Sequence, residues 1–334
     1  MKKSLILFFS LLGYINLSAQ QDKHFSMWYA SPSLLNPAAT ATMPEDFQFF
    51  TNFRMQWLTA ATAPFRTNAF SAEAKLGKGK LSNGHFGAGL HFYNDGAGSK
   101  LTTNVVSIPL NYVFNLNRNN IFSVGVLPGL YQQSFNNNQT WDSQWDGLAF
   151  NGATPSGEFL NQSFMRFDLG AGIFYQYQAT ETDSKFHIGL AANHLTKPNI
   201  NFASTHEALD RSYTAHAGAN VRYKYSKVGF SPMVYTLFQG KNKNVVFGSS
   251  IDFLLKDAAT RTVFRKEQSI SFGIYHRLND AVIASFMYKY AGFQAGLSYD
   301  ANVSTARTYT STMGAFELFA RFAIYRNPRT RLLR

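Results

Sequence analysis

The sequence predicts an all-β fold: a transmembrane antiparallel β-barrel of about 14 strands, preceded by an irregular N-terminal segment. Apolar side chains recur at alternate positions, in stretches of about ten residues, from Phe47 to Tyr325. Aromatic residues form 16% of the chain and charged residues only 15%, whereas soluble domains hold about 25% charged residues. Beyond residue 19, no apolar run approaches the roughly 20 residues that a spanning helix needs.

The first 19 residues have the features of a secretory signal peptide. Lys2 and Lys3 precede an apolar run at 5–17, which is too short to span a bilayer. Ser18 and Ala19 are small, so we expect cleavage after Ala19. The chain has no cysteine, so disulfides and a lipidated cysteine are excluded. The sequence therefore predicts an exported protein stabilised by burial or by a membrane.

Residues 20–46 form the irregular segment. Three prolines interrupt regular structure: Pro32, Pro37 and Pro44. Aromatic residues are interspersed: Phe25, Trp28 and Tyr29. Three interpretations remain open: the segment plugs the lumen, contacts a periplasmic partner, or straps an irregular lead-in to the barrel rim.

The barrel is predicted over 47–325. The strand candidates lie near 47–58, 66–76, 84–94, 103–115, 120–134, 163–177, 185–193, 211–225, 228–238, 244–254, 267–277, 280–289, 292–301 and 313–325. In 84–93, Phe86 and Leu90 share one face, and His91 lies on the other. In a membrane barrel the apolar face meets lipid and the small or polar face lines the lumen.

The connections between the strand candidates alternate in length. If the amino end is periplasmic, the short turns lie on the periplasmic side: Asn115–Asn120, Ser226–Lys227 and Ala291–Gly292. The long segments lie outside: Phe135–Gln162 and Asn193–Asp210. Two connections break the rule: the tight turn Leu278–Asp280 and the long segment Leu255–Lys266. The pattern still favours one closed domain, because closure leaves no unpaired strand edge in lipid.

The chain is basic, with a formal net charge of +12 and a pI near 9.7. This charge is scattered and no basic helix is present, so nucleic acid is not an expected partner. We expect contact with anionic lipid head groups or cell-wall polymer instead. The basic tail, 326–334, includes Arg326, Arg329 and Arg331. It is either a solvated tail or a contact to an acidic partner or to cell-wall polymer.

Charges on the expected inward face distinguish a conducting pore from a filled barrel. A conducting pore should show a ladder of like charges along its lumen. The charges at the expected inward positions are isolated in the sequence: Arg166, Asp168, Glu317 and Arg321. This favours a filled barrel over the rival reading, an outer-membrane channel or transporter for small or apolar solutes.

No motif for catalysis, metal binding or cofactor binding is found. His206-Glu207 lacks a second histidine at helical spacing, and no Gly-x-Ser-x-Gly elbow is present. Residues 77–80 lack the spacing of a phosphate loop. We therefore expect a protein that is not an enzyme and that has no catalytic residues, metal or cofactor.

Several segments, taken in order, resemble one known family. They are Gln21-Asp22, Phe25-Ser26, Asn36-Pro37-Ala38, Phe53–Trp57, Asp142–Gly147 with Pro155–Glu158, Asn193–Asn199, Gly273–Ala281, Gly296–Asp300 and Gly314–Glu317. Together they are similar to the PorP/SprF family of type IX secretion system outer-membrane proteins. The chain departs from the family at its carboxy end, where a tail without a terminal aromatic residue follows Tyr325.

The resemblance implies an outer-membrane protein that works with other proteins. Its expected partners are the periplasmic secretion ring, peptidoglycan-linked components, or a large secreted surface adhesin used in gliding motility. The candidate contact residues are Trp28, Asn36, Pro37, Trp141, Trp145 and Asp146, with the arginines of the tail. Two alternatives stand beside this reading: Asn36-Pro37 fixes a turn, and the loop tryptophans cover the barrel mouth.

Overall fold

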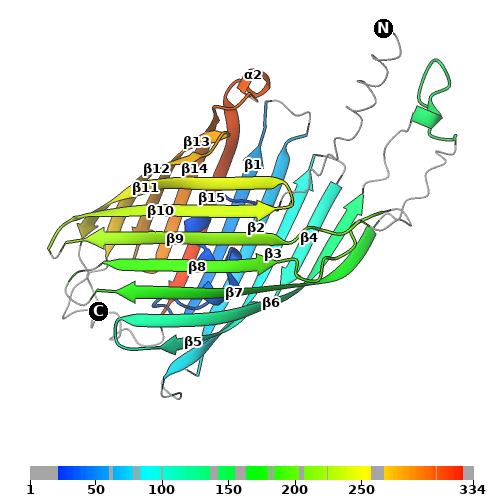
Figure 1. Ribbon diagram of the computed structural model, residues 1–334. Coiled ribbons are helices and arrows are strands. Elements are labelled where there is room, and N and C mark those ends of the chain that lie inside the picture. Colours follow the sequence, from blue (N-terminus) through cyan, green and yellow to red (C-terminus); the bar gives the residue numbers. More distant parts are fainter. Residues whose placement is uncertain are drawn as a thin grey trace, which may run out of the picture.

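The computed structural model describes residues 22–59, 63–77, 81, 83–98, 101–135, 142–154, 163–179, 182, 184–202, 207–223, 225–256, 267–305 and 307–325. These residues form one antiparallel sheet of 15 strands, rolled into a barrel (Figure 1). The sheet closes because β1 pairs with β15 on one side and with β2 on the other. Within the described residues, no helix is long and apolar enough to cross a membrane.

The strands are β1 Phe47–Gln56, β2 Phe65–Leu76, β3 Gly84–Ala97, β4 Leu101–Ser107, β5 Leu110–Asn115, β6 Asn120–Phe135, β7 Ser163–Gln178, β8 Lys185–Asn193, β9 Ser212–Arg222, β10 Val228–Gln239, β11 Asn242–Lys256, β12 Gln268–Arg277, β13 Ala281–Tyr290, β14 Phe293–Asn302 and β15 Met313–Ile324. Short helices are η2 Trp28–Ala30, η3 Pro32–Leu34, η4 Pro37–Ala39, η5 Asp142–Gln144 and α2 Arg307–Thr310. Each predicted strand has a counterpart, so the predicted barrel is confirmed.

One predicted strand, 103–115, is divided into β4 and β5. Both pieces pair with β3 and with β6, so together they fill a single place in the wall. The break falls at Ile108-Pro109. Proline has no N–H to give to the ladder, so regular pairing is interrupted there.

The two faces of the wall differ as the alternation predicts. On β3, Phe86 and Leu90 are 51% and 44% exposed on the outside, whereas His91 is 2% exposed. The outward row on most strands is apolar, and the inward row carries serine, asparagine and buried charge. Apolar side chains on the outer surface suit hydrocarbon, since burial of polar groups there would cost several kcal/mol each.

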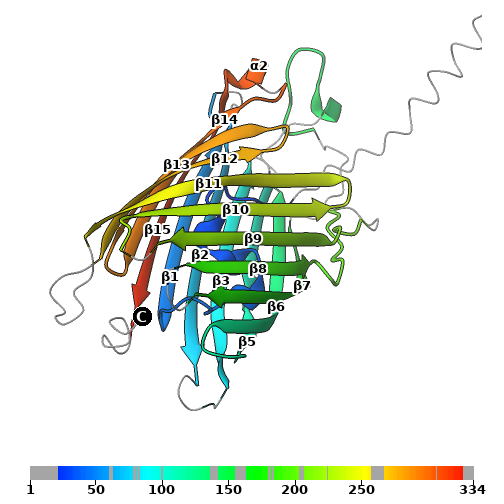
Figure 2. The ribbon, with the colours of Figure 1, turned by 60° about the vertical axis from the view of Figure 1, so that its left-hand side comes forward.

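The barrel has two distinct ends. At the terminal end β1 begins and β15 finishes, and the backbone N–H of Asp46 donates to the carbonyl of Ile324 at 3.0 Å. At the opposite end, here called the loop end, the chain leaves β6 toward η5 and leaves β8 toward β9 (Figure 2).

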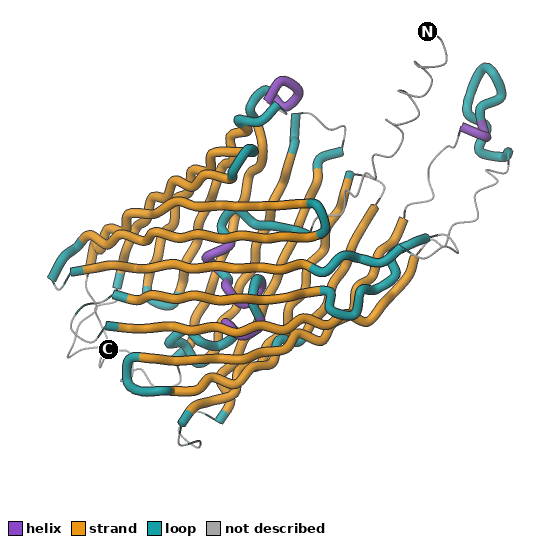
Figure 3. The backbone as a smooth tube through the Cα atoms, in the orientation of Figure 1, coloured by secondary structure: helices purple, strands orange, loops and turns teal. Residues whose placement is uncertain are grey.

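Residues 22–46, here called the lumen segment, run through the inside of the barrel. Their three short helices lie within the ring of strands, as Figure 3 shows in purple. Asp22 contacts His194 at the loop end, and Asp46 bonds to β15 at the terminal end. The segment therefore passes from one end of the lumen to the other.

Candidate functional site

A cluster of four charged side chains joins the lumen segment to the wall. Arg54 of β1, Arg277 of β12, Asp300 of β14 and Glu317 of β15 form this ion cluster. Arg54 lies 3.1 Å from Asp300 and 3.2 Å from Glu317, and Arg277 lies 3.0 Å from Asp300. All four are buried. Pairing of this kind is necessary, because an unpaired buried charge is strongly destabilising.

The carboxylates of the ion cluster also hold the backbone of the lumen segment. Glu317 accepts hydrogen bonds from the backbone N–H groups of Ser26 at 2.7 Å and Met27 at 2.9 Å. The Ser26 hydroxyl donates to Asp300 at 2.7 Å. An irregular segment has no ladder of its own, so its buried N–H groups need such partners. The ion cluster thus forms the binding site for residues 26–27 of the lumen segment.

Three of the four inward charges named from the sequence are therefore not isolated, and for these three the expectation was wrong; the fourth, Arg166, is exposed and bonds to the carbonyl of Met165. Glu317 belongs to the ion cluster, Arg321 lies 2.8 Å from Glu45, and Asp168 lies 2.6 Å from His194. Alternation along one strand shows which way a charge points. It does not show which side chain of a distant strand, or of the lumen segment, lies at the same height in the barrel.

Aromatic stacking holds the next part of the lumen segment. The ring of Trp28 stacks on Tyr235 of β10 with 5.4 Å between centroids, and Tyr29 stacks on Tyr275 of β12 at 5.2 Å. Trp28 is 3% exposed and packs in an apolar cluster with Val246. These contacts fill the lumen with side chains.

Asn36 fixes a tight approach of the segment to the wall. Its side-chain oxygen accepts from the N–H of Ala38 at 3.0 Å, and its amide donates to the carbonyl of Ile173 at 2.9 Å. On the facing wall, a Cβ at Gly172 would lie 2.1 Å from Asn36, and a Cβ at Gly125 would lie 2.7 Å from the backbone nitrogen of Ala38. The glycines on the inward face are thus what lets the segment lie against the sheet.

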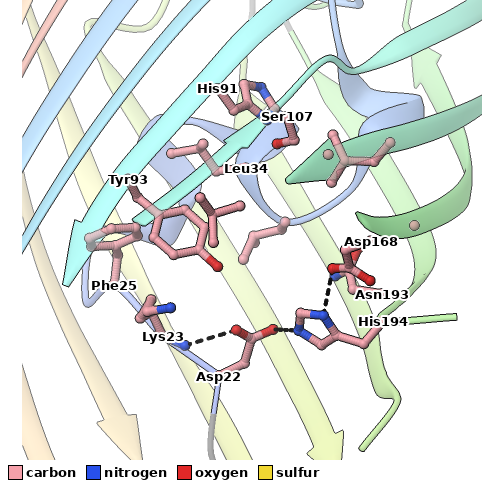
Figure 4. A pocket seen from close by; sticks show the side chains of 15 residues that line it. Asp22, Lys23, Phe25, Leu34, His91, Tyr93, Ser107, Asp168, Asn193 and His194 are labelled. Carbon is pink, nitrogen blue, oxygen red and sulfur yellow. Dashed lines mark hydrogen bonds and ion pairs between the residues drawn. The ribbon is translucent and has the colours of Figure 1, made fainter. Parts of the chain in front are cut away.

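At the loop end, Asp22 and His194 form a buried ion pair. His194 Nε2 lies 3.1 Å from Asp22, and Nδ1 lies 2.6 Å from Asp168 of β7 (Figure 4). Burial alone would lower the pKa of His194, but the two carboxylates raise that pKa to about 10. Burial alone would raise the pKa of Asp22, but the charge and hydrogen bond of His194 bring it down to about 2.

A small cavity of about 80 Å³ lies beside this ion pair. Its wall combines the ionic side chains with apolar groups from the lumen segment, such as Leu34 (Figure 4), and from β4 and β6, Val105 and Leu127. Among the described residues, no group of three or more metal-ligating side chains is suitably placed to hold a metal ion.

The predicted contact residues fall into three places. Trp28, Asn36 and Pro37 are buried inside the barrel, where they hold the lumen segment. Trp145 is 50% exposed and packs on Phe150 with centroids 4.9 Å apart, and the Asp146 carboxylate accepts the N–H groups of Leu148 and Ala149. Trp141, Arg326, Arg329 and Arg331 lie outside the described residues. Partner binding by these residues stays a prediction.

The ion cluster was missed as a site from the sequence, although a signal was present. Each of its members lies in one of the segments that carry the family resemblance: Arg54, Arg277, Asp300 and Glu317. Four more residues that hold the lumen segment lie in other segments of the series: Asp22, Ser26, Asn36 and His194. Much of the resemblance therefore marks residues that bind the lumen segment within the barrel.

One known family and several solved structures resemble this chain. A family model described as type IX secretion system membrane protein PorP/SprF matches residues 17–322. No curated protein matches the chain. Among solved structures, the Ralstonia pickettii toluene transporter TbuX has a TM-score of 0.48 at 10% identity, covering 87% of this chain and 93% of that chain. A Pseudomonas aeruginosa FadL homologue has 0.46 at 11% identity, covering 87% and 93%. The COG4313 outer membrane channel from Pseudomonas putida F1 has 0.40 at 10% identity, covering 85% and 96%.

Proposed function

Because this chain belongs to the PorP/SprF family of type IX secretion system membrane proteins, we propose that it acts in the outer membrane as a docking component of that machinery. The observation that carries the proposal is the occupied lumen: the chain's own residues 22–46 pass through it and are held by the ion cluster and by stacked rings. A barrel filled in this way has its ends and its outer wall left for interaction with other molecules.

The energetics of the lumen segment support docking over conduction. Withdrawing the segment would leave Glu317 and Asp300 without the donors of Ser26 and Met27. Each buried polar group left unpaired costs about 1–3 kcal/mol, and more when it is charged. Withdrawal of the segment would also separate Trp28 from its apolar cluster. Spontaneous opening of the lumen is therefore expected to be rare.

The proposed partners follow from the family and from the two ends. At the terminal end we propose contact with the periplasmic secretion ring or with peptidoglycan-linked proteins. At the loop end we propose contact with a large surface adhesin, with Trp145 and Asp146 exposed for it. The outer wall would contact outer-membrane lipid, after export directed by residues 1–19. This role requires no catalysis.

Affinity purification of a tagged copy tests the docking proposal. The protein would be crosslinked in cells, solubilised in mild detergent, and its partners identified by mass spectrometry. We expect ring, peptidoglycan-linked or adhesin proteins to be enriched over a control barrel of similar abundance. Recovery of the barrel alone, after crosslinking and under gentle detergent, would count against docking.

The rival function, a channel or transporter for small or apolar solutes, has one observation in its favour. The cavity at the loop end has apolar walls that include Leu34, Val105 and Leu127. Its volume is only about 80 Å³, whereas ligand pockets usually enclose about 300–1,000 Å³. A transport role would therefore need the lumen segment to move. Uptake of a labelled apolar solute, lost on deletion of the gene and restored by this chain, would support it.

A further inference from the structure

The described parts of the connection between β8 and β9 pack against the wall at the loop end of the barrel. Residues 194–202 and 207–210 are here called the lid. Asn199 and Ala208 form an antiparallel bridge, and the N–H of Leu209 donates to the carbonyl of Pro198 at 2.9 Å. Leu209 is 6% exposed and packs with Val105 of β4 inside the barrel mouth. The lid therefore has a buried apolar contact with the wall.

Asp22 is linked to both ends of the lid. At the start of the lid, His194 Nε2 lies 3.1 Å from the Asp22 carboxylate. At its other end, the link runs through Gln239, the last residue of β10. The Gln239 side-chain oxygen accepts the backbone N–H of Asp22, and its amide donates to the carbonyl of Asp210 at 3.1 Å. Asp22 thus bonds directly to the start of the lid and, through Gln239, indirectly to its end.

The backbone at His194 is held in an unfavourable conformation. Its φ is 56°, in the left-handed region that glycine adopts freely and other residues uncommonly, although asparagine, aspartate and histidine adopt it more often than most. Such a conformation persists only where surrounding contacts fix it. The contacts around His194 include Asp22 and Asp168, at the two nitrogens of the imidazole, and the backbone bond from the N–H of Leu195 to the carbonyl of Leu169 at 2.9 Å. Loss of the Asp22 carboxylate therefore removes one of several bonds that hold the start of the lid, which also include hydrogen bonds from the Thr196 hydroxyl to Phe167 and Asp168.

We propose that Asp22 is a latch between the lumen segment and the lid, so that lid opening and release of the segment's amino end occur together. The proposal is independent of which partner the barrel docks. It rests on the shared bonds of Asp22, on the strained backbone of His194 and on the burial of Leu209. By linkage, any molecule that binds the open lid more tightly than the closed lid will also favour release of residues 22–25.

The absence of cysteine makes a labelling test clean. Leu209→Cys reports on the lid and Phe25→Cys reports on the lumen segment, each as the only thiol in the chain. Labelling rates with a water-soluble maleimide are compared with and without Asp22→Asn. We expect the substitution to raise both rates about tenfold or more, since a hydrogen bond to a charged group is worth at least that factor.

The matched control is Glu45→Gln, which weakens the bond between the same segment and Arg321 at the terminal end. It should leave the lid reporter at its original rate. His194→Asn is the second variant, because asparagine tolerates the left-handed backbone but carries no charge. It should raise both rates as Asp22→Asn does. Comparable heat-modifiable migration of all variants on gels would establish that the barrels are folded.

Two results would overturn the proposal. In the first, Asp22→Asn raises labelling at position 25 while position 209 keeps its original rate, so that segment and lid move independently. In the second, Glu45→Gln raises labelling at position 209 as much as Asp22→Asn does, so that any loosening of the segment frees the lid. Parallel increases that are specific to Asp22 and His194 would support the latch.

Discussion

At the scale of single residues, buried charge holds this barrel's interior in place. Arg54 and Glu317 face each other across the β1–β15 pair, and Asp300 and Arg277 complete the set. The sequence shows four separate charged residues in four strands. Only the register of the strands brings them into three ion pairs of 3.0, 3.1 and 3.2 Å, and register depends on pairings far apart in the chain.

Removing one member of the ion cluster should therefore be costly. Arg54→Ala leaves two buried carboxylates short of their partner, and we expect the free energy of unfolding to fall by about 3–5 kcal/mol. Denaturant unfolding of the refolded protein in lipid vesicles measures this. The control is Lys289→Gln, whose 2.9 Å pair with Glu267 is about one-third exposed. That loss should be below about 1 kcal/mol, and equal losses in the two variants would refute the special role of the cluster.

The pair of Asp22 and His194 makes stability depend on pH in a definite direction. The pKa of His194 rises from 6.5 to about 10 on folding, so its contribution is complete below pH 6.5 and is lost as pH rises toward 10. The pKa of Asp22 falls from 3.8 to about 2, so its contribution is complete above pH 3.8 and is lost as pH falls toward 2. The carboxylate of Asp168 and the rings of Tyr131 and Tyr93 also face this region.

We expect the difference in free energy of unfolding between wild type and His194→Asn, here called the stability gap, to be largest near pH 5–6. Above pH 6.5 the gap should shrink by at most about 1.4 kcal/mol per pH unit. Unfolding curves of both proteins at pH 5.5, 7.5 and 9.5 give the comparison. A gap that stays constant, or grows with pH, would show that His194 is not a charged partner of Asp22.

At the scale of elements, the strands could be predicted and the lumen segment could not. Strand β12 shows a two-residue period over its whole length, and that period follows directly from strand geometry. The break at Pro109 was overlooked because its apolar neighbours continue the pattern. Residues 22–46 have no period. Their structure comes from contacts with strands that lie up to about 290 residues away, such as the bond from Met27 to Glu317.

The close approach of η4 to the wall gives a test at this scale. A Cβ at Gly125 would lie 2.7 Å from backbone atoms of Pro37 and Ala38, which cannot rotate away. We expect Gly125→Ala to push the segment out of place, so that a unique thiol at Ser33→Cys becomes reactive at least tenfold faster. Loss of one buried polar contact already accounts for a change of that size.

Gly152→Ala is the matched control, because nothing lies within 4 Å of a Cβ there. It should leave the reactivity of the thiol at position 33 unchanged. If Gly125→Ala also leaves that thiol protected, the segment does not need the inward glycines, and the packing described for Asn36 and its neighbours is wrong.

At the scale of the whole molecule, the chain supplies both a membrane wall and the filling of that wall. The outer rows are apolar and exposed, whereas buried side chains of the inner rows bind the lumen segment. Filling of the lumen was one of three interpretations left open by the sequence, because composition alone does not distinguish a plug from a periplasmic arm. The segments that carry the family resemblance contain the residues that hold the plug. They could have identified it only if the contacts between their side chains were known, such as that of Ser26 with Asp300.

Single-channel recording of the purified full chain in planar bilayers tests the closed lumen most directly. We expect wild-type protein to insert without a steady open state, and Gly125→Ala to show openings, because that substitution displaces the segment from the wall. Silent wild type together with a conducting variant would support a barrel that is filled by its own chain and acts through docking. A steady, large conductance from the wild-type protein would contradict the account and favour transport.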